Sequence, residues 1–340
     1  MDEPARIAGG RIARRRVIRL TAVAGGLALA GPILRAAAGG RPAAEIWRGT
    51  ALGAEASITL YHEDAGEARR LLRAAVAELR RLEAVFSLYR EDSALSRLNR
   101  EGRLAVPPLE LVELLATARS FAERTGGAFD PTVQPLWRLY ARHFARPGAD
   151  PAGPPAAAVE AARALVGWRD LRVESTGIAL ARRGMAVTLN GIAQGYITDR
   201  VADLLEREGM RTVLVDLGEI RAVGRHPDGR PWRAGIRDPR GEGLLRVLPL
   251  AGRALATSAG SGTRFDAAGR FHHLFDPRSG VSARRYLSVS VLAPRATVAD
   301  ALSTALYAMS DGEREALRDG LEGVEAWILH TDGREEHWRV

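Results

Sequence analysis

The segment Asn190-Gly-Ile-Ala-Gln-Gly-Tyr-Ile-Thr-Asp-Arg-Val-Ala-Asp-Leu-Leu-Glu-Arg-Glu-Gly209 is followed closely by Thr212-Val-Leu-Val-Asp-Leu217. This stretch begins with a glycine-containing turn, continues with a helical pattern over residues 194–208 that stops at Gly209, and ends in an apolar strand. The turn lacks the Gly-x-Gly-x-x-Gly spacing of a dinucleotide-binding Rossmann unit. The stretch therefore predicts helices packed on a sheet, but not a regular Rossmann fold.

The other elements on both sides of this stretch give an α+β pattern. Helical spacing of apolar residues predicts helices over 65–88, 93–99, 109–125 and 297–309, the last beginning near a threonine cap. Strands are predicted over 46–61 (interrupted by Gly53), 187–189, 212–217, 233–236, 254–258, 286–293 and 324–330. Residues 145–157 predict a surface loop, and no period of 20–50 residues repeats. We expect mixed or antiparallel sheets with packed helices in a single compact catalytic unit, residues 45–340.

The composition excludes several kinds of chemistry. The 340 residues include no cysteine, which rules out thiol nucleophiles, thiolate metal sites, disulfides and a lipid anchor on cysteine. They also include no lysine, so a lysine nucleophile is excluded. There is no Gly-x-Ser-x-Gly elbow that would expose a serine nucleophile. The chain therefore needs another route to catalysis.

The N-terminus has the features of an export signal. Arg14-Arg-Arg-Val-Ile-Arg19 precedes an apolar run over 20–34 and then Ala36-Ala-Ala38. This order predicts a twin-arginine signal peptide over residues 1–38 and a periplasmic mature protein that is not a lipoprotein. A membrane anchor is the alternative, but the run is shorter than the ~20 residues of a membrane span. Removing the arginine-rich leader lowers the net charge of +8, which makes nucleic acid an unexpected partner.

A candidate metal site lies in Asp300-Ala-Leu-Ser-Thr304. Asp300 and Thr304 are four residues apart on a predicted helix and share one face, with Ser303 beside them. A carboxylate with hydroxyl groups offers the oxygen ligands that Mg²⁺ prefers. Alternatively, Asp300 only stabilises the helix dipole near the N-terminus.

A candidate base lies in His272-His-Leu-Phe-Asp-Pro-Arg-Ser-Gly280. Histidine accepts protons near neutral pH, and the turn at Asp276-Pro277 would hold an imidazole at the end of a strand. Adjacent residues of a strand face opposite sides, so only one of His272 and His273 can face a given site. Either histidine could instead be structural.

Two glycine-containing segments could approach a ligand. Residues 190–195 lead into a helix, whose N-terminal N–H groups can bind phosphate, and Gly126-Gly-Ala-Phe-Asp130 follows a helix. Each segment could equally be a turn or a helix stop. Tyr89, Trp137 and Trp232 could stack on a flat ring or belong to the core.

Taken in order, the motifs resemble those of the ApbE family, the FAD:protein FMN transferases. The resemblance covers nearly the whole chain after the leader, from about Trp47 onward. It is carried by the segments 87–99, 127–132, 190–199, 273–280 and 300–304. It implies an ApbE-like fold that cleaves FAD with Mg²⁺, moves FMN onto a threonine or serine of a partner protein through a phosphoester, and releases AMP.

The resemblance also implies roles for individual residues. His273 takes the place of the base that deprotonates the acceptor hydroxyl. Metal contacts are implied for the backbone carbonyl of Gly191 and for Asp300, Ser303 and Thr304. FAD contacts are implied for Leu52, Tyr89, Ala128, Phe129, Asp130, Thr188, Gln194 and Leu274.

The sequence departs from the family pattern at three places. Thr188 replaces an acidic residue, Gln194 replaces a lysine, and Gly218-Glu219 replaces a double glycine. Segments 190–199 and 215–224, together with the leader, are most similar to the NosX branch of nitrous oxide respiration. That branch implies the FMN-binding domain of a NosR-like membrane redox protein as acceptor. The alternatives are an FAD pyrophosphatase that gives free FMN and AMP, and a non-catalytic flavin-binding maturation protein.

Overall fold

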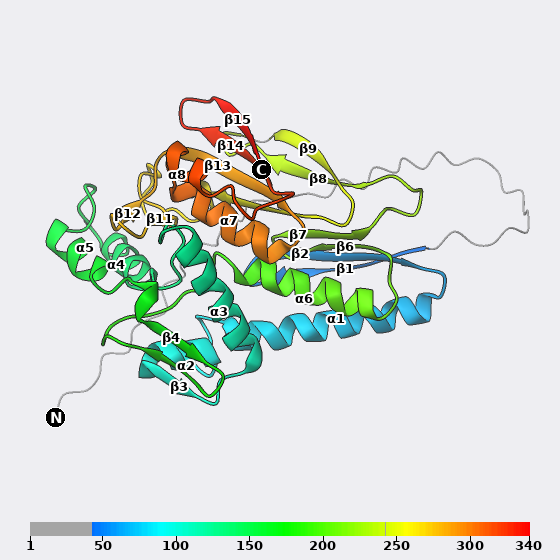
Figure 1. Ribbon diagram of the computed structural model, residues 1–340, viewed down its shortest axis with the longest axis horizontal. Helices are drawn as coiled ribbons and strands as arrows, with labels where there is room; N and C mark the ends of the chain where they lie inside the picture. The colour runs from blue at the N-terminus through cyan, green and yellow to red at the C-terminus, as the bar shows by residue number, and fades with distance from the viewer. Residues whose placement is uncertain (1–42, 242) are drawn as a thin grey trace, which may run out of the picture.

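The computed structural model of the chain describes residues 43–241 and 243–340, and the predicted signal peptide lies outside these residues. A sheet of eight strands, all paired antiparallel, forms the centre (Figure 1). Its order is β1 (Ala43–Ala51), β2 (Ala54–His62), β6 (Thr212–Asp216), β7 (Ile220–Gly224), β10 (Ala254–Ala259), β13 (Tyr286–Ala293), β14 (Glu325–His330) and β15 (Glu335–Arg339).

Three helices cover one face of this sheet. They are α1 (Ala65–Phe86), α6 (Ala193–Arg207) and α7 (Ala296–Ala308), and α6 packs against both of the others (Figure 1). Alternate side chains of the central strands, such as Val213, Val215 and Val291, point into this helical layer and are buried there.

A two-stranded hairpin covers part of the opposite face. It consists of β8 (Trp232–Arg237) and β9 (Leu244–Leu250). The alternate residues Leu214, Leu255 and Leu292 of the central strands pack against it. Burial on both faces explains why the centre of β6, Val213-Leu-Val215, is a continuous apolar run instead of an alternating one.

The remaining elements surround one end of the sheet. These are α2 (Ala94–Glu101), α3 (Leu109–Arg124), α4 (Gln134–Phe144), α5 (Ala156–Arg163), α8 (Asp311–Ala316), the sheet β3 (Arg103–Ala105), β5 (Gly177–Leu180) and β4 (Leu171–Glu174), and the pair β11 (Phe275–Asp276) and β12 (Val281–Ser282). Single turns of 3₁₀ helix occur at Trp168–Asp170 and Gly260–Gly262. In the described part of the chain, no helix has the length and apolarity that a membrane crossing requires.

The structure confirms the predicted α+β class with antiparallel sheets and corrects several elements. The single interrupted strand over 46–61 is the hairpin β1–β2, which turns at Leu52-Gly53. Residues 187–189 are not a strand, and α4, α5 and β15 were not predicted. The threonine cap of α7 is also wrong, because Arg295 is the N-cap residue and its side chain makes no capping bond.

A carboxylate from another helix caps α7. Asp199 of α6, which is 1% exposed, accepts hydrogen bonds from the backbone N–H of Ala296 at 3.0 Å and of Thr297 at 2.9 Å. The hydroxyl of Thr297 donates to it at 2.7 Å, and Arg221 forms an ion pair with it at 3.0 Å. The buried side chain of Asp199 therefore fixes the start of α7 against α6, although Asp199 and Ala296 are 97 positions apart in the sequence.

We expect Asp199→Ala to lower the free energy of unfolding by about 3 kcal/mol, because it leaves buried donors and an arginine without their acceptor. Urea unfolding measures this loss. Asp170→Ala is a suitable control, because it removes a half-exposed ion pair with Arg182 and should cost less than about 1 kcal/mol. An Asp199→Ala protein as stable as wild type would contradict the capping role.

Candidate active site

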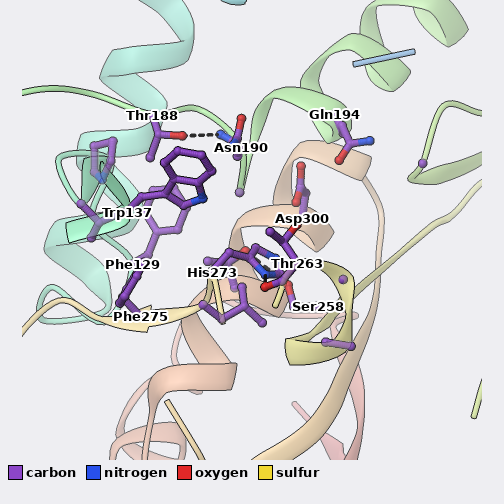
Figure 2. Close-up of a pocket in the computed structure, with 18 of the residues that line it drawn as sticks. Phe129, Trp137, Thr188, Asn190, Gln194, Ser258, Thr263, His273, Phe275 and Asp300 are labelled. Atoms are coloured by element: carbon purple, nitrogen blue, oxygen red, sulfur yellow. Dashed lines mark hydrogen bonds between the residues drawn. The ribbon is translucent and has the colours of Figure 1, made fainter. Parts of the chain in front are cut away.

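A cavity of about 220 Å³ opens where the helical layer meets one end of the sheet (Figure 2). We call it the main cavity. Its walls come from six places in the sequence: the β1–β2 turn, the segment from the end of α3 into α4, the start of α6, the β6–β7 turn, the segment from β10 to just past β11, and α7. The fold therefore brings together residues of the segments 127–132, 190–199, 273–280 and 300–304, but none of the segment 87–99.

Three of the four predicted metal contacts line this cavity. They are Gly191, Asp300 and Thr304. A Cβ on Gly191 would lie 2.9 Å from the Thr304 hydroxyl oxygen, so glycine is what lets this backbone approach α7. The N–H of Gly195 donates to an Asp300 carboxylate oxygen at 2.9 Å, which ties the loop at the start of α6 to α7.

Ser303, the fourth predicted contact, does not line the cavity and instead contacts a residue that was not among the predicted site residues. Its hydroxyl is 2.8 Å from the hydroxyl of Ser258, which is also 3.3 Å from the hydroxyl of Thr304. Ser258 ends a buried strand and begins the small-residue loop 258–262. Only the position of that loop opposite α7 identifies Ser258 as part of the site.

The wall of the main cavity is rich in acidic side chains. Asp130, Glu219 and Asp300 line it, and His273 is the one basic side chain among the described residues of its wall. Asp300 is 4% exposed, and burial together with the nearby Asp199 raises its pKa well above the usual carboxyl range. Buried carboxylates beside hydroxyl and carbonyl oxygens, with no arginine in the wall, suit a hard cation.

The described residues contain no group of three or more His, Asp or Glu side chains placed to hold a metal ion on their own. This is compatible with the predicted set, since three of its four members contribute a hydroxyl or a backbone carbonyl. A magnesium ion at such a site also keeps several waters or substrate oxygens as ligands.

The structure separates the roles of the two histidines. His273 lines the main cavity, and its Nδ1 lies 3.2 Å from the backbone carbonyl oxygen of Thr263 (Figure 2). A proton on Nδ1 donated to that carbonyl makes Nε2 the basic nitrogen of the ring. His272, in contrast, is 5% exposed, packs edge-on against Tyr307 and accepts a hydrogen bond from the Leu274 N–H at 3.3 Å.

Burial lowers the pKa of His272 to about 4, with Arg284 and Arg264 adding repulsion. The unfolded chain therefore binds a proton at a higher pH than the folded protein, and stability falls as the pH drops below the ordinary histidine value. Between pH 7 and pH 5 this one group should cost about 2 kcal/mol of unfolding free energy.

The His272→Asn variant tests this linkage. Urea unfolding of both proteins at pH 7 and pH 5 should show the variant losing about 2 kcal/mol less than wild type. The carboxylates titrate in both proteins, so their effects cancel in the comparison. Equal losses in the two proteins would show that His272 carries a proton in the folded state.

Most of the predicted FAD contacts line the main cavity: Leu52, Ala128, Phe129, Asp130, Thr188, Gln194 and Leu274. Tyr89 does not. It is 68% exposed and lines an adjoining cavity of about 410 Å³, which shares Trp137 and Asn190 with the main cavity. The ring-stacking hypothesis thus remains open for Tyr89 and Trp137, whereas Trp232 is buried in the core beneath the β8–β9 hairpin.

Two of the predicted FAD contacts, Asp130 and Thr188, form hydrogen bonds within the loops of the cavity wall. The Asp130 carboxylate accepts hydrogen bonds from the N–H and hydroxyl of Thr132 at 2.8 and 2.6 Å, and from the N–H of Trp168 at 3.1 Å. The Thr188 hydroxyl accepts from the N–H of Asn190 at 3.2 Å (Figure 2). Both side chains therefore shape the loops that form the wall.

The replacement residue Gln194 is held at the β6–β7 turn. Its side-chain amide donates to the carbonyl of Leu217 at 3.3 Å. Gly218 has a φ of +103°, and a Cβ there would lie 2.3 Å from the Gln194 amide nitrogen. Only glycine suits this position, so the shortened turn and Gln194 fit each other.

The ApbE family model matches residues 52–328. The chain belongs to the ApbE family. Its relatives include the FAD:protein FMN transferase of Treponema pallidum, 33% identical over 306 residues that cover 83% of each chain. The FAD:protein FMN transferase of Salmonella typhimurium is 29% identical over 310 residues, which cover 84% of this chain and 88% of the relative.

Solved ApbE structures have the same fold. The ApbE protein of Thermotoga maritima superimposes with a TM-score of 0.77 at 29% identity, over 86% of this chain and 96% of the other. The flavin transferase ApbE of Vibrio cholerae gives a TM-score of 0.74 at 26% identity, over 87% of this chain and 97% of the other. The family and the fold expected from the motifs are thus confirmed.

Proposed function

We propose that this chain is a Mg²⁺-dependent FAD:protein FMN transferase that attaches FMN through a phosphoester to a threonine or serine of a partner protein. One observation carries the proposal beyond family membership. The main cavity places an imidazole, His273, in the same pocket as the buried carboxylate and the hydroxyls of α7, Asp300 and Thr304. A base and a cation-binding oxygen set are the two parts that this transfer requires.

The proposed metal ion would be bound by residues of α7 and of the loop before α6. The Gly191 carbonyl, Asp300 and Thr304 would hold Mg²⁺, with Ser303 beside them. When bound, the ion would neutralise the pyrophosphate oxygens, for which the described residues of the wall offer no arginine. Phosphoryl transfer needs mainly positioning and charge neutralisation, so the enzyme needs no nucleophile of its own.

The transfer step then involves His273 and the partner. The partner's hydroxyl oxygen bonds to the phosphorus of the FMN half, and the bond from that phosphorus to the oxygen of the AMP phosphate breaks. His273 accepts the hydroxyl proton at Nε2, while the Thr263 carbonyl holds the ring through Nδ1–H. AMP leaves, and FMN remains on the partner.

The setting of the reaction is part of the proposal. The twin-arginine signal over residues 1–38 supports export of the mature domain, residues 45–340, to the periplasm. The variant segments 190–199 and 215–224 support a place in the NosX branch. The acceptor would then be the FMN-binding domain of a NosR-like membrane redox protein.

Nucleotide products distinguish the proposal from its two alternatives. The mature protein is incubated with FAD and Mg²⁺, with and without the acceptor domain, and AMP and free FMN are measured by chromatography. A transferase forms AMP in step with labelled acceptor and little free FMN. Equal amounts of AMP and free FMN regardless of acceptor would indicate a pyrophosphatase. FAD binding without any product would indicate a flavin-binding maturation protein.

A further inference from the structure

Glu219 is a buried carboxylate in the wall of the main cavity to which no role has been given. It lies in the β6–β7 turn and is 7% exposed. Its carboxylate accepts a hydrogen bond from the backbone N–H of Thr257. The other oxygen, Oε2, is shielded from solvent and has no hydrogen-bond partner among the described residues. A structural carboxylate at this depth is normally satisfied on both oxygens.

The surroundings of Glu219 are acidic. Burial and the nearby Asp300 and Asp216 raise its pKa well above the carboxyl range. The closest arginine in sequence, Arg221, pairs with Asp199 at 3.0 Å and Asp203 at 2.6 Å instead. No cation among the described residues therefore compensates the carboxylate.

Glu219 is also tied to the hydroxyl cluster of the site. Thr257, whose N–H holds its carboxylate, directly precedes Ser258, whose hydroxyl contacts those of Ser303 and Thr304. On the other side, the Gly195 N–H holds Asp300. Two carboxylates, one from the β6–β7 turn and one from α7, thus line one cavity, and each accepts a hydrogen bond from a backbone N–H.

We propose that Glu219 supplies a second carboxylate to the metal ion bound by Asp300. The inference rests on the metal site of the proposed function and adds a residue to it. An oxygen that is buried and unpartnered in the protein then has a cation as its partner. Two carboxylates also balance the charge of a divalent ion before the pyrophosphate arrives.

Manganese binding tests the proposal without turnover. The full chain is titrated with Mn²⁺ alone, and free ion is followed by electron paramagnetic resonance. Glu219→Gln keeps the size of the side chain and should weaken Mn²⁺ binding about tenfold or more. Asp216→Asn is the matched control, because Asp216 is equally buried but does not line the cavity, and its Mn²⁺ affinity should stay within about twofold of wild type.

Two results would overturn the proposal: unchanged Mn²⁺ affinity in Glu219→Gln, or an equal loss in Asp216→Asn, which would indicate a general charge effect. Glu219→Asp keeps the charge and withdraws the oxygens, and it should bind Mn²⁺ with an affinity between those of wild type and Glu219→Gln. It keeps the test valid if Glu219→Gln does not fold.

FAD binding in the presence of a chelator gives a second readout. Without a metal ion Glu219 has no cation to hold, and its raised pKa favours the neutral acid, so Glu219→Gln should bind FAD within about twofold of wild type. Weaker metal-free binding would contradict the proposal. Neither readout involves an acceptor protein, so a failure of FMN transfer would refute the proposed function while leaving this test of Glu219 interpretable.

Discussion

Replacing Asp300 by alanine should lower the rate of FMN transfer at least ~1,000-fold, a loss of about 4 kcal/mol of transition-state stabilisation. The reason is the chemistry of the main cavity: Asp300 is the buried carboxylate on α7 beside the hydroxyl and carbonyl oxygens, and no arginine lies among the described residues of the wall. Labelled acceptor, measured over time at several Mg²⁺ concentrations, gives the rate.

The fold should survive this change, because the cap of α7 is Asp199 and not Asp300. Circular dichroism and urea unfolding check this directly. Asp311→Ala is a useful control, because Asp311 is an exposed residue of α8 outside the cavity, and its transfer rate should stay within about twofold. Full activity of Asp300→Ala with unchanged Mg²⁺ dependence would refute the metal assignment.

Replacing His273 by alanine should lower FMN transfer by about 100- to 10,000-fold, the range expected for loss of a general base. FAD and Mg²⁺ binding should change little, because the imidazole acts on the acceptor hydroxyl. Fluorescence titration with FAD and a single-turnover transfer assay separate these two effects. Added imidazole should restore part of the rate, since it can enter the space left by the ring.

His272→Asn is the matched control for His273. The two residues are adjacent, but His272 packs against Tyr307 behind the wall and does not line the cavity. Its variant should transfer FMN at close to the wild-type rate at pH 7. If His272→Asn loses as much activity as His273→Ala, the base cannot be assigned to His273 from its position.

The local patterns of the sequence predict the helices well. The spacing of apolar residues in α1, α3 and α6 predicts both ends of each helix to within about two residues. It does so because each helix buries one continuous apolar stripe along its length. The amphipathic α4 was missed, since its residues pack against a small aromatic cluster formed by distant segments around Phe271 and Phe275. The β1–β2 hairpin was read as one strand because its turn contains a leucine, Leu52, in left-handed conformation with a φ of +47°.

The candidate site was predictable where residues lie close in sequence. Asp300 and Thr304 share a helix face, and the structure brings both to the main cavity, as their spacing indicates. Ser258, Glu219 and Asp199 could not be found in this way. Each acts across the interface between α7 and another element, so its role depends on tertiary packing and leaves no local pattern.

Intact mass spectrometry of an acceptor domain decides whether this chain transfers FMN to another protein. The mature protein is mixed with FAD, Mg²⁺ and the FMN-binding domain of a NosR-like protein, and the mass of the acceptor is measured. We expect a mass increase of one FMN, lost when Mg²⁺ is removed and strongly slowed in His273→Ala and Asp300→Ala. An acceptor whose mass stays unchanged while AMP and FMN accumulate in solution would contradict this expectation.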